Sequence, residues 1–202
     1  MVIWLILSGL LGYILGSANS SLIVGKFYGV DVRKHGSGNA GTTNTLRTLG
    51  KKAALLVLIG DMLKGVLAYA AGYYITGHGE IGGMIGGTVA VIGHVWPVYF
   101  GFKGGKGVLT SLAVLLMIDW LVALILLGLF IIIVLLTRYV SLGSVVCAAL
   151  FPTLAVIMGR DAAVILFSAA IALLVIIMHR SNIQRLLKGK EAKLGEKKQE
   201  VT

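Results

Sequence analysis

Two stretches of the sequence combine glycine, small polar side chains and cations in a way that suits phosphate binding. The first loop, residues 35–47, reads HGSGNAGTTNTLR. Glycine lets successive backbone N–H groups converge on one anion, hydroxyl and amide groups add neutral donors, and arginine adds a planar bidentate donor. The alternative is a flexible polar linker. The candidate residues here are Ser37, Gly38, Asn39, Thr43, Asn44 and Arg47.

The second loop, residues 93–107, ends in a glycine-rich segment at the expected start of a helix. A helix N-terminus attracts anions through its unpaired N–H groups and its dipole. The segment is not a nucleotide-binding P-loop, because Phe100 and Gly107 stand where that motif needs glycine and a hydroxyl residue. The alternative is a basic loop that contacts anionic lipid headgroups. The candidate ligands are Lys103, Gly104, Gly105, Lys106 and Gly107.

Two histidines and one serine in these loops have open roles. His94 is either a packed interfacial histidine or part of the site. Ser37 is a weak candidate nucleophile, because the sequence around it lacks the G-x-S-x-G elbow of hydrolases. His35 could act as its base, but no acidic residue within the first loop would orient that histidine. An acyl-serine mechanism is therefore disfavoured.

A third group of candidate residues follows the last apolar run. His179 and Asn182 are three residues apart, so on a helix they share one face, and a histidine there could act as a general base. An interfacial histidine is the alternative. Ser144 lies near the start of an expected helix, where small-residue packing is the alternative to substrate binding. We expect a solvated tail beyond Lys188, which Glu191 could brace.

The composition requires a membrane to position these residues. Hydrophobic residues make up 57% of the 202-residue chain and charged residues only 13%, about half the share of a soluble domain. The formal charge of +10 is spread among loops, which argues against a nucleic-acid-binding module. The single cysteine, Cys147, lies in an apolar run and excludes a disulfide framework. We expect no metal and no cofactor.

The apolar runs predict an all-α integral membrane protein, a single membrane-integral domain over residues 1–202. A bilayer core of about 30 Å takes about 20 helical residues. The count of seven requires a tight turn at Asp119-Trp120. It places every Lys and Arg except Lys64 and Arg160 on one side, so the N-terminus is expected outside and the C-terminus in the cytoplasm. The predicted spans are residues 2–26, 53–76, 81–100, 108–118, 121–136, 142–158 and 162–178, followed by a cytoplasmic tail over 179–202.

Two charged residues fall inside the second predicted span. A charge at the bilayer centre costs about 2.5–3.5 kcal/mol on insertion scales. Asp61 and Lys64 have the i, i+3 spacing that allows them to pair. We therefore favour a structural ion pair over direct substrate contact. Glycine pairs four residues apart, Gly12 with Gly16 and Gly82 with Gly86, predict close helix packing.

Taken together, these motifs resemble the bacterial acyl-phosphate:glycerol-3-phosphate acyltransferase family, PlsY. The matching stretches are Gly36 through Arg47, Gly93 through Gly107, and His179 through Glu191. The resemblance implies a seven-helix enzyme of the bacterial inner membrane with its active site at the cytoplasmic face. It also implies essential roles for Ser37 and Arg47, glycerol 3-phosphate binding by the glycine-rich segment, active-site roles for His179 and Asn182, and a structural role for Glu191.

The implied reaction moves a fatty acyl group from acyl-phosphate to the 1-hydroxyl of glycerol 3-phosphate. It gives lysophosphatidic acid and inorganic phosphate. Acyl-phosphate is already activated, so we favour direct transfer, with either His179 or a substrate phosphate as the base. The expected partners are the two substrates, membrane lipids and, as a pathway neighbour, a soluble enzyme that forms acyl-phosphate. We expect no nucleic acid and a monomer. A transporter of phosphorylated solutes is the alternative function.

Overall fold

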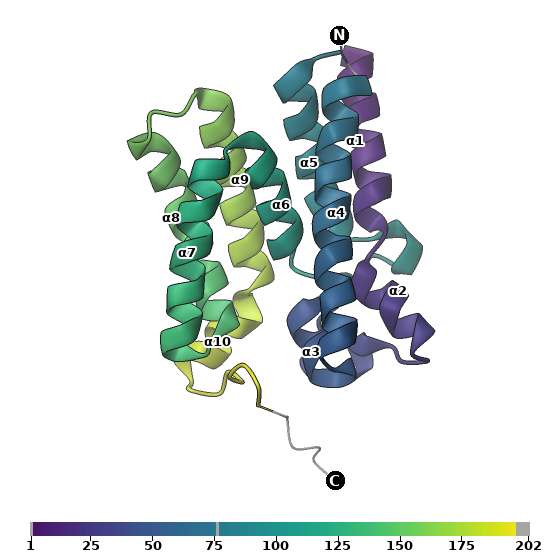
Figure 1. Cartoon of the computed structure of the whole chain (residues 1–202), viewed down its shortest axis with the longest axis vertical. Helices are drawn as coiled ribbons and strands as arrows, with labels where there is room; N and C mark the ends of the chain where they lie inside the picture. Colours follow the sequence, from purple (N-terminus) through teal and green to yellow (C-terminus); the bar gives the residue numbers. More distant parts are fainter. Residues whose placement is uncertain (1, 76, 197–202) are drawn as a thin grey trace. The chain divides into compact units, whose positions relative to one another are not determined.

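The computed structural model describes residues 2–75 and 77–196 and is all-helical in that part of the chain (Figure 1). The chain divides into two compact units, Met1–Trp120 and Leu121–Thr202. Unit 1 contains α1 (Val2–Ser17), α2 (Ser20–Phe27), α3 (Thr42–Leu49), α4 (Lys51–Ile75), α5 (Gly79–Val95) and α6 (Val108–Ile118), with short 3₁₀ turns at Val32–Lys34 and Val98–Phe100. Unit 2 contains α8 (Val140–Ile157), α9 (Ala162–Met178) and α10 (Arg180–Leu187), and α7 (Trp120–Thr137) starts at the boundary.

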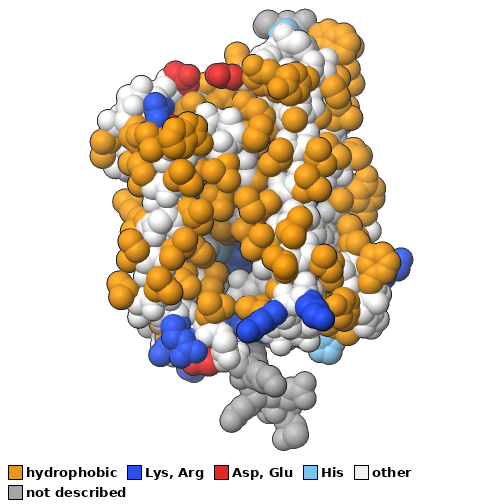
Figure 2. Space-filling view, in the orientation of Figure 1, with side chains coloured by type: hydrophobic (Ala, Val, Ile, Leu, Met, Phe, Trp, Pro, Cys, Tyr) orange, Lys and Arg blue, Asp and Glu red, His pale blue; other side chains and the backbone are white. Residues whose placement is uncertain are grey.

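Five helical segments of the described chain are long and apolar enough to cross a membrane, and a sixth joins them if α9 and α10, bent by 60°, count as one. The five are Val2–Phe27, Lys51–Ile75, Gly79–Phe100, Trp120–Thr137 and Val140–Ile157. At 11 residues, α6 is shorter than a usual span. Hydrophobic side chains cover most of the helix surface in view in Figure 2, as a lipid-facing surface requires. The protein is thus an integral membrane protein. The count of seven and the orientation stay predictions.

In unit 1, α1 and α4 both pack against α5. Glycine makes this packing possible, since a β-carbon at Gly12 would overlap the Gly86 carbonyl and one at Gly16 would overlap the backbone of Ala90. Such close approach is how helices associate where lipid offers no hydrophobic driving force. The predicted packing role of these glycines is confirmed.

The first predicted span, 2–26, coincides with the candidate span Val2–Phe27, but its helix is not continuous. It breaks at Ala18 and Asn19, and α2 starts at Ser20. The Asn19 side chain causes the restart, because its Oδ1 accepts a hydrogen bond from the Leu22 N–H at 3.1 Å and so caps α2. The third predicted span, 81–100, lies within the candidate span Gly79–Phe100, but its α-helix, α5, stops at Val95, two residues before Pro97.

The other boundaries lie close to the predictions. The runs 108–118 and 162–178 coincide with α6 and α9, and the chain leaves helical geometry at Asp119, where the turn is expected. Helices α4, α7 and α8 each begin one or two residues before the predicted start. Residue 76, the predicted end of the second span, lies outside the described residues, as do residues 197–202 of the tail.

The tail predicted to be solvated is partly so where unit 2 is described, since residues 189, 190, 195 and 196 are exposed and residues 191–194 are partly buried. Helices α8 and α9 pack together, with the Phe151 and Phe167 rings edge to face at 5.9 Å. Beyond α10 the described chain folds back on the end of α7. The Leu194 N–H donates to the Arg138 carbonyl at 2.7 Å, and Arg138 Nη2 donates to the Leu194 carbonyl at 2.8 Å. These bonds attach Leu194 to the end of α7 within unit 2.

Candidate active site

The first loop is built around the side chain of Asn44. Its Oδ1 accepts the Ser37 N–H at 2.7 Å, and its Nδ2 donates to the carbonyls of Val32 at 2.8 Å and His35 at 3.1 Å. Asn44 is buried, with 1% of its surface exposed. Its amide is therefore occupied by the loop backbone, and in this structure it shapes the loop that the sequence predicts it to line.

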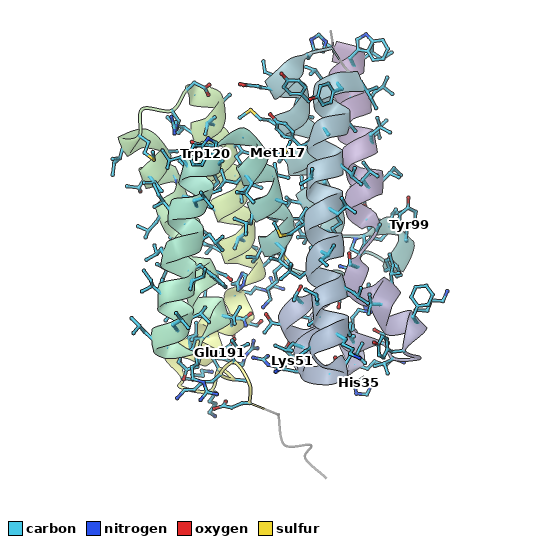
Figure 3. The ribbon with its side chains drawn as sticks, viewed as in Figure 1. His35, Lys51, Tyr99, Met117, Trp120 and Glu191 are labelled. Carbon is cyan, nitrogen blue, oxygen red and sulfur yellow. The ribbon has the colours of Figure 1, made fainter. Side chains whose placement is uncertain are left out.

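Positive backbone dihedrals explain the glycines on either side of Ser37. Gly36 has φ +59° and Gly38 has φ +75°, a region that other residues rarely adopt. A β-carbon at Gly36 would also overlap Asn44 Oδ1. The turn leaves Ser37 exposed while its N–H is held by Asn44. His35, labelled in Figure 3, is exposed beside it at the α3 end of unit 1.

The second half of the first loop is helical, which the sequence analysis missed. Helix α3 starts at Thr42 and carries Thr43 and Arg47 on its length. Thr45 anchors it, since its hydroxyl lies 2.7 Å from the Ser21 hydroxyl of α2 and also donates to the Gly41 carbonyl at 3.2 Å. Arg47 is partly buried on this short helix. The predicted binding residues Gly38 and Asn39 precede it in irregular chain.

Arg33 ties the first loop to the second. Its Nη1 donates to the Phe100 carbonyl at 2.9 Å and the Lys103 carbonyl at 3.3 Å, while Nε and Nη2 bind both oxygens of Asp31 at 3.0 Å. The side-chain hydrogen bonds from Arg33 hold the pKa of Asp31 below its usual range. In the sequence, Arg33 is only one of the loop cations on which the predicted orientation rests. Its position just before the first loop was the available signal.

The glycine-rich segment of the second loop packs on the end of α5. The Gly104 N–H donates to the Val95 carbonyl at 3.0 Å, and the Gly105 N–H donates to the His94 carbonyl at 3.1 Å. A β-carbon at Gly105 would overlap the His94 ring and approach the Ala40 carbonyl at 2.6 Å. These two N–H groups are therefore used by the fold, in place of the anion cradle that the sequence suggests for them.

The donors left to an anion lie one step further along the chain. Gly107 adopts φ +80° and precedes α6 without a side-chain cap, so the first N–H groups of α6 follow directly after Lys106. Lys106 is partly buried and Lys103 is exposed. A helix N-terminus next to a lysine is the arrangement that the predicted phosphate site needs.

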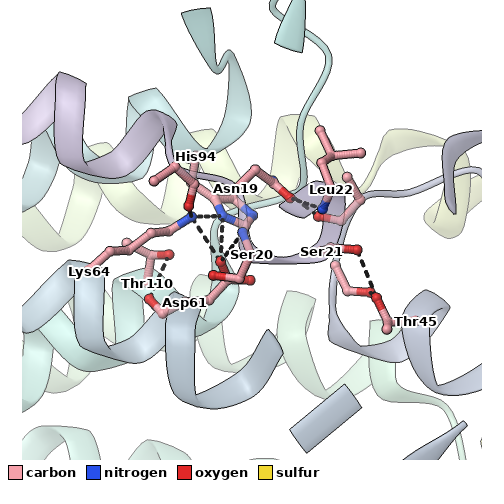
Figure 4. A network of polar contacts seen from close by, with 12 residues as sticks. Asn19, Ser20, Ser21, Leu22, Thr45, Asp61, Lys64, His94 and Thr110 are labelled. Carbon is pink, nitrogen blue, oxygen red and sulfur yellow. Dashed lines mark hydrogen bonds and ion pairs between the residues drawn. The ribbon is translucent and has the colours of Figure 1, made fainter. Parts of the chain in front are cut away.

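Behind the glycine-rich segment lies a buried cluster of Asp61, Lys64 and His94 (Figure 4). Lys64 Nζ lies 2.9 Å from Asp61 Oδ1 and 2.7 Å from His94 Nδ1. The three residues are 1%, 5% and 4% exposed. The predicted Asp61–Lys64 ion pair is confirmed, and His94 is its third member.

In unit 2, His179 ends α9 and Asn182 lies on α10. Both are buried, at 3% and 5% exposed. His179 Nδ1 lies 2.8 Å from the Val175 carbonyl, which can only accept, so the ring carries its proton on Nδ1. The neutral ring then has its basic lone pair on Nε2.

Glu191 gathers three donors at the end of unit 2 (labelled in Figure 3). Its Oε1 accepts from the Ser141 hydroxyl at 2.7 Å and from Asn182 Nδ2 at 2.6 Å, and its Oε2 pairs with Arg185 Nε at 2.7 Å. Burial disfavours the ionised carboxylate, but the hydrogen bonds from Asn182, Ser141 and Arg185 outweigh it and hold the Glu191 pKa below its usual range. These contacts agree with the supporting role expected of Glu191.

Ser144 is buried in α8, and its hydroxyl donates to the Val140 carbonyl at 3.0 Å, which satisfies the hydroxyl within its own helix.

Among residues 2–75 and 77–196, no three His, Cys, Asp or Glu side chains are grouped so that they could hold a metal ion.

The comparisons with known proteins give one consistent result. The family model described as glycerol-3-phosphate acyltransferase matches residues 6–189. The chain belongs to this family. The chain is 44% identical over 193 residues to the glycerol-3-phosphate acyltransferase of Thermoanaerobacter sp. (strain X514). The aligned region covers 95% of this chain and 96% of that protein.

Two solved structures resemble this acyltransferase over nearly its whole length. Both are of PlsY (YgiH), an integral membrane glycerol 3-phosphate acyltransferase. Its glycerol 3-phosphate form has a TM-score of 0.89 and 38% identity, with 95% of this chain and 96% of that chain covered. Its lysophosphatidic acid form has a TM-score of 0.86 and 37% identity, with 95% of each chain covered.

The resemblance noted from the motifs is therefore confirmed. This acyltransferase is a membrane enzyme that acylates glycerol 3-phosphate and forms lysophosphatidic acid. The transporter alternative gains no support from the comparisons. Two questions then concern the chemistry of the site: which residues catalyse the reaction, and which molecule donates the acyl group.

Proposed function

We propose that the acyl donor is an acyl-phosphate and that the products are lysophosphatidic acid and inorganic phosphate. The observation that carries this proposal is the joining of the two cation-bearing loops within unit 1. Arg33 bonds to carbonyls of the second loop, and Gly105 lies against Ala40 of the first. Two substrates that each carry a phosphate need two such anion sites close together.

Several of the predicted ligands bind substrate in this proposal, whereas Asn44, Gly104 and Gly105 shape the two loops. Lys106 and the N-terminus of α6 bind the phosphate of glycerol 3-phosphate, with Lys103 at the rim. Arg47 and the first turn of α3, with Thr43, bind the second phosphate. Gly38 and Asn39 give the first loop its shape and its remaining donors, and Ser37 donates a hydrogen bond near the reacting carbonyl. The support is the exposure of Ser37 and the short distance along the chain from Gly107 to the first N–H groups of α6.

The chemistry is a direct transfer. The glycerol 1-hydroxyl oxygen attacks the acyl carbonyl carbon, the bond from that carbon to the phosphate oxygen breaks, and inorganic phosphate leaves with its electron pair. Cations and N–H groups stabilise the charge that develops in the transition state. The hydroxyl proton goes to His179 Nε2. This nitrogen is the basic one in the neutral ring, because Nδ1 carries the proton that is donated to the Val175 carbonyl. A phosphate oxygen of the substrate is the alternative proton acceptor.

The remaining assignments follow from the same proposal. Asn182 and Ser144 donate or accept hydrogen bonds near the reacting centre. The chain crosses a bacterial inner membrane seven times as a monomer and a single functional domain, with its N-terminus outside and its loops facing the cytosol, where glycerol 3-phosphate is available. A soluble enzyme that forms acyl-phosphate supplies the donor.

The decisive assay adds palmitoyl-phosphate and glycerol 3-phosphate to the purified protein in lipid mesophase and follows both products, with palmitoyl-CoA as a parallel donor. We expect phosphate release only when both substrates are present, in equal amount to lysophosphatidic acid. Turnover with palmitoyl-CoA alone as donor would overturn the proposed donor. Phosphate release without glycerol 3-phosphate would indicate a hydrolase.

Two further measurements test the mechanism. The His179→Ala variant is expected to lose kcat, with the acid limb of the pH–rate profile abolished; loss of affinity with kcat retained would transfer the base role to a substrate phosphate. Direct transfer predicts that no acyl-enzyme forms. Trapping a labelled acyl group on Ser37 would therefore contradict it.

A further inference from the structure

The buried cluster of Asp61, Lys64 and His94 is more elaborate than an ion pair between neighbouring turns of one helix requires. The Lys64 ammonium has three protons, and three acceptors surround it: Asp61 Oδ1 at 2.9 Å, His94 Nδ1 at 2.7 Å and the Ala18 carbonyl at 3.3 Å. Because Nδ1 accepts from Lys64, the neutral His94 ring carries its proton on Nε2. The contacts fix the ring in one tautomer and one orientation.

His94 carries this constraint into the second loop. Its backbone carbonyl accepts the Gly105 N–H at 3.1 Å, and its ring lies so close to Gly105 that a β-carbon there would overlap Nε2. Lys106 is the next residue. The His94 ring, which Lys64 orients, therefore packs against Gly105, the residue immediately before Lys106.

The other side of the glycine-rich segment is attached to the same turn of α4. The Thr110 hydroxyl of α6 donates to the backbone carbonyl of Asp61 at 3.2 Å (Figure 4). The turn of α4 that carries Asp61 and Lys64 therefore reaches both flanks of residues 104–107. It contacts the preceding segment through the bond from Lys64 to His94, and α6 through the bond from Thr110 to the Asp61 backbone carbonyl. The first loop meets this region too, since Asn19 Nδ2 lies 3.4 Å from the Ala40 carbonyl and the Ser20 N–H lies 3.4 Å from Asp61 Oδ1.

We propose that the buried cluster positions Lys106 and the N-terminus of α6 for binding the phosphate of glycerol 3-phosphate, with His94 as the positioning residue that transmits the constraint. None of its three members touches substrate in this scheme. The inference rests on the proposed role of Lys106. A purely structural ion pair in a membrane helix would not need to contact a loop. The inference therefore gives the charges of this cluster a function in catalysis.

The test compares steady-state constants of His94→Leu and the wild type, with both proteins shown to be folded by thermal unfolding. Leucine removes the acceptor for Lys64 and the ring beneath Gly105. We expect the KM for glycerol 3-phosphate to rise about 10- to 100-fold, the loss typical of a slight misplacement of a binding group. The KM for palmitoyl-phosphate and the kcat should change much less, because the donor is bound by other residues.

Two controls separate positioning from general destabilisation. Ser8→Ala removes another buried bond between α1 and α5, from the Ser8 hydroxyl to the Gly82 carbonyl at 2.7 Å, and should lower stability without moving either KM. His94→Asn keeps an acceptor near the Nδ1 position and should recover most of the affinity for glycerol 3-phosphate. Equal effects of His94→Leu and Ser8→Ala on KM would overturn the proposal.

A double-mutant cycle asks whether the effect passes through Lys106. In a Lys106→Met background, His94→Leu should raise the KM for glycerol 3-phosphate by less than about twofold, because the group being positioned is already gone. Full additivity would show that His94 acts elsewhere. If His94→Leu does not fold, Gly105→Ala provides the second variant. Its β-carbon pushes the loop and the His94 ring apart while every side chain of the cluster is kept, and it should give the same KM pattern. A normal KM in that variant would refute the inference.

Failure of this inference is distinguishable from failure of the proposed function. The function is tested by the wild-type products alone. The positioning role is tested by the ratio of variant to wild type, and also by equilibrium binding of radiolabelled glycerol 3-phosphate, which needs no turnover and no acyl donor. Unchanged binding in His94→Leu would overturn the positioning role even in a fully active acyltransferase.

Discussion

Two carboxylates, one in each unit, hold polar groups together by similar contacts but in different surroundings. Asp61 lies inside α4 and binds Lys64 and the Ser20 N–H. Glu191 follows α10 and binds the side chains of Ser141, Asn182 and Arg185. Both carboxylates are nearly inaccessible to solvent, with side-chain exposures of 2% and 7%.

The difference lies in the cation. The Lys64 side chain is 6% exposed, whereas that of Arg185 is 38% exposed. If its carboxylate is lost, Arg185 is still solvated by water, but Lys64 is left as an unpaired charge in an apolar interior. The two clusters therefore teach that the cost of breaking an ion pair is set by the partner that remains, more than by the distance across the pair.

The largest effect is expected from breaking the pair in unit 1. Asp61→Ala should destabilise unit 1 by about 3–5 kcal/mol, because it strands the Lys64 ammonium. Thermal unfolding in detergent, together with the yield of monodisperse protein, measures this loss. The matched control is the double variant Asp61→Ala/Lys64→Met, which removes both charges and should be the more stable of the two. A double variant less stable than Asp61→Ala would refute the role given to the stranded charge.

A smaller effect is expected in unit 2. Glu191→Gln keeps an amide oxygen for Ser141 and Asn182 but loses the charge, so the cost should be roughly 1–3 kcal/mol, as for one hydrogen bond to an ionised group. Glu196→Gln is the control, since Glu196 is exposed and accepts the Lys193 N–H at 2.9 Å. Its effect should stay within about 0.5 kcal/mol. Equal losses in the two variants would mean that the Glu191 contacts add nothing.

The pH dependence of the same variant gives the comparison a second measurement. The pKa of Glu191 is lower in the folded protein than its ordinary value of 4.5, so the folded state favours the ionised form. Its stabilisation is complete above about pH 4.5 and is lost as the pH falls through the folded pKa. The stability gap between wild type and Glu191→Gln should therefore be constant from pH 8 to about pH 5 and close below that. A gap that widens on acidification would contradict the assignment.

The sequence predicted the apolar helices well, because a membrane span needs only a long apolar run. It missed the break between α1 and α2, although Asn19, which caps α2, is a local signal for it; the Ala18 carbonyl at the break is satisfied by Lys64, 46 residues away. It missed α3 for a related reason. Threonine and asparagine are poor helix formers, and α3 is stabilised by tertiary bonds such as that from Thr45 to Ser21.

The site residues show a different limit of sequence reasoning. Glycine at 104 and 105 has two physical explanations, room for a phosphate and room for a neighbouring backbone, and the pattern alone does not separate them. The structure assigns the second, since Gly105 packs on His94. The Asp61–Lys64 pair was predictable from i, i+3 spacing, but His94 was not, because its approach depends on the packing of α4 against α5.

The smallest effect is expected from Arg33, whose ion pair with Asp31 is the exposed counterpart of both clusters. Its side chain is 30% exposed and that of Asp31 is 31%, so water screens the pair. Arg33→Lys keeps the charge but loses the bidentate contact, and should cost less than about 1 kcal/mol. Thermal unfolding at low and high salt measures it, with Lys34→Gln, an exposed neighbour, as the control.

The salt dependence of stability then distinguishes the exposed ion pair of Arg33 from the buried pair of Asp61. Added salt should shrink the difference between Arg33→Lys and wild type, because mobile ions reach an exposed pair, and should leave the Asp61→Ala difference nearly unchanged, because they do not reach a buried one. An Arg33→Lys loss as large and as salt-insensitive as that of Asp61→Ala would mean that the Phe100 and Lys103 carbonyl bonds, and not the Asp31 pair, supply the stability at this position. That result would place Arg33 with the buried cluster among the residues that fix the second loop.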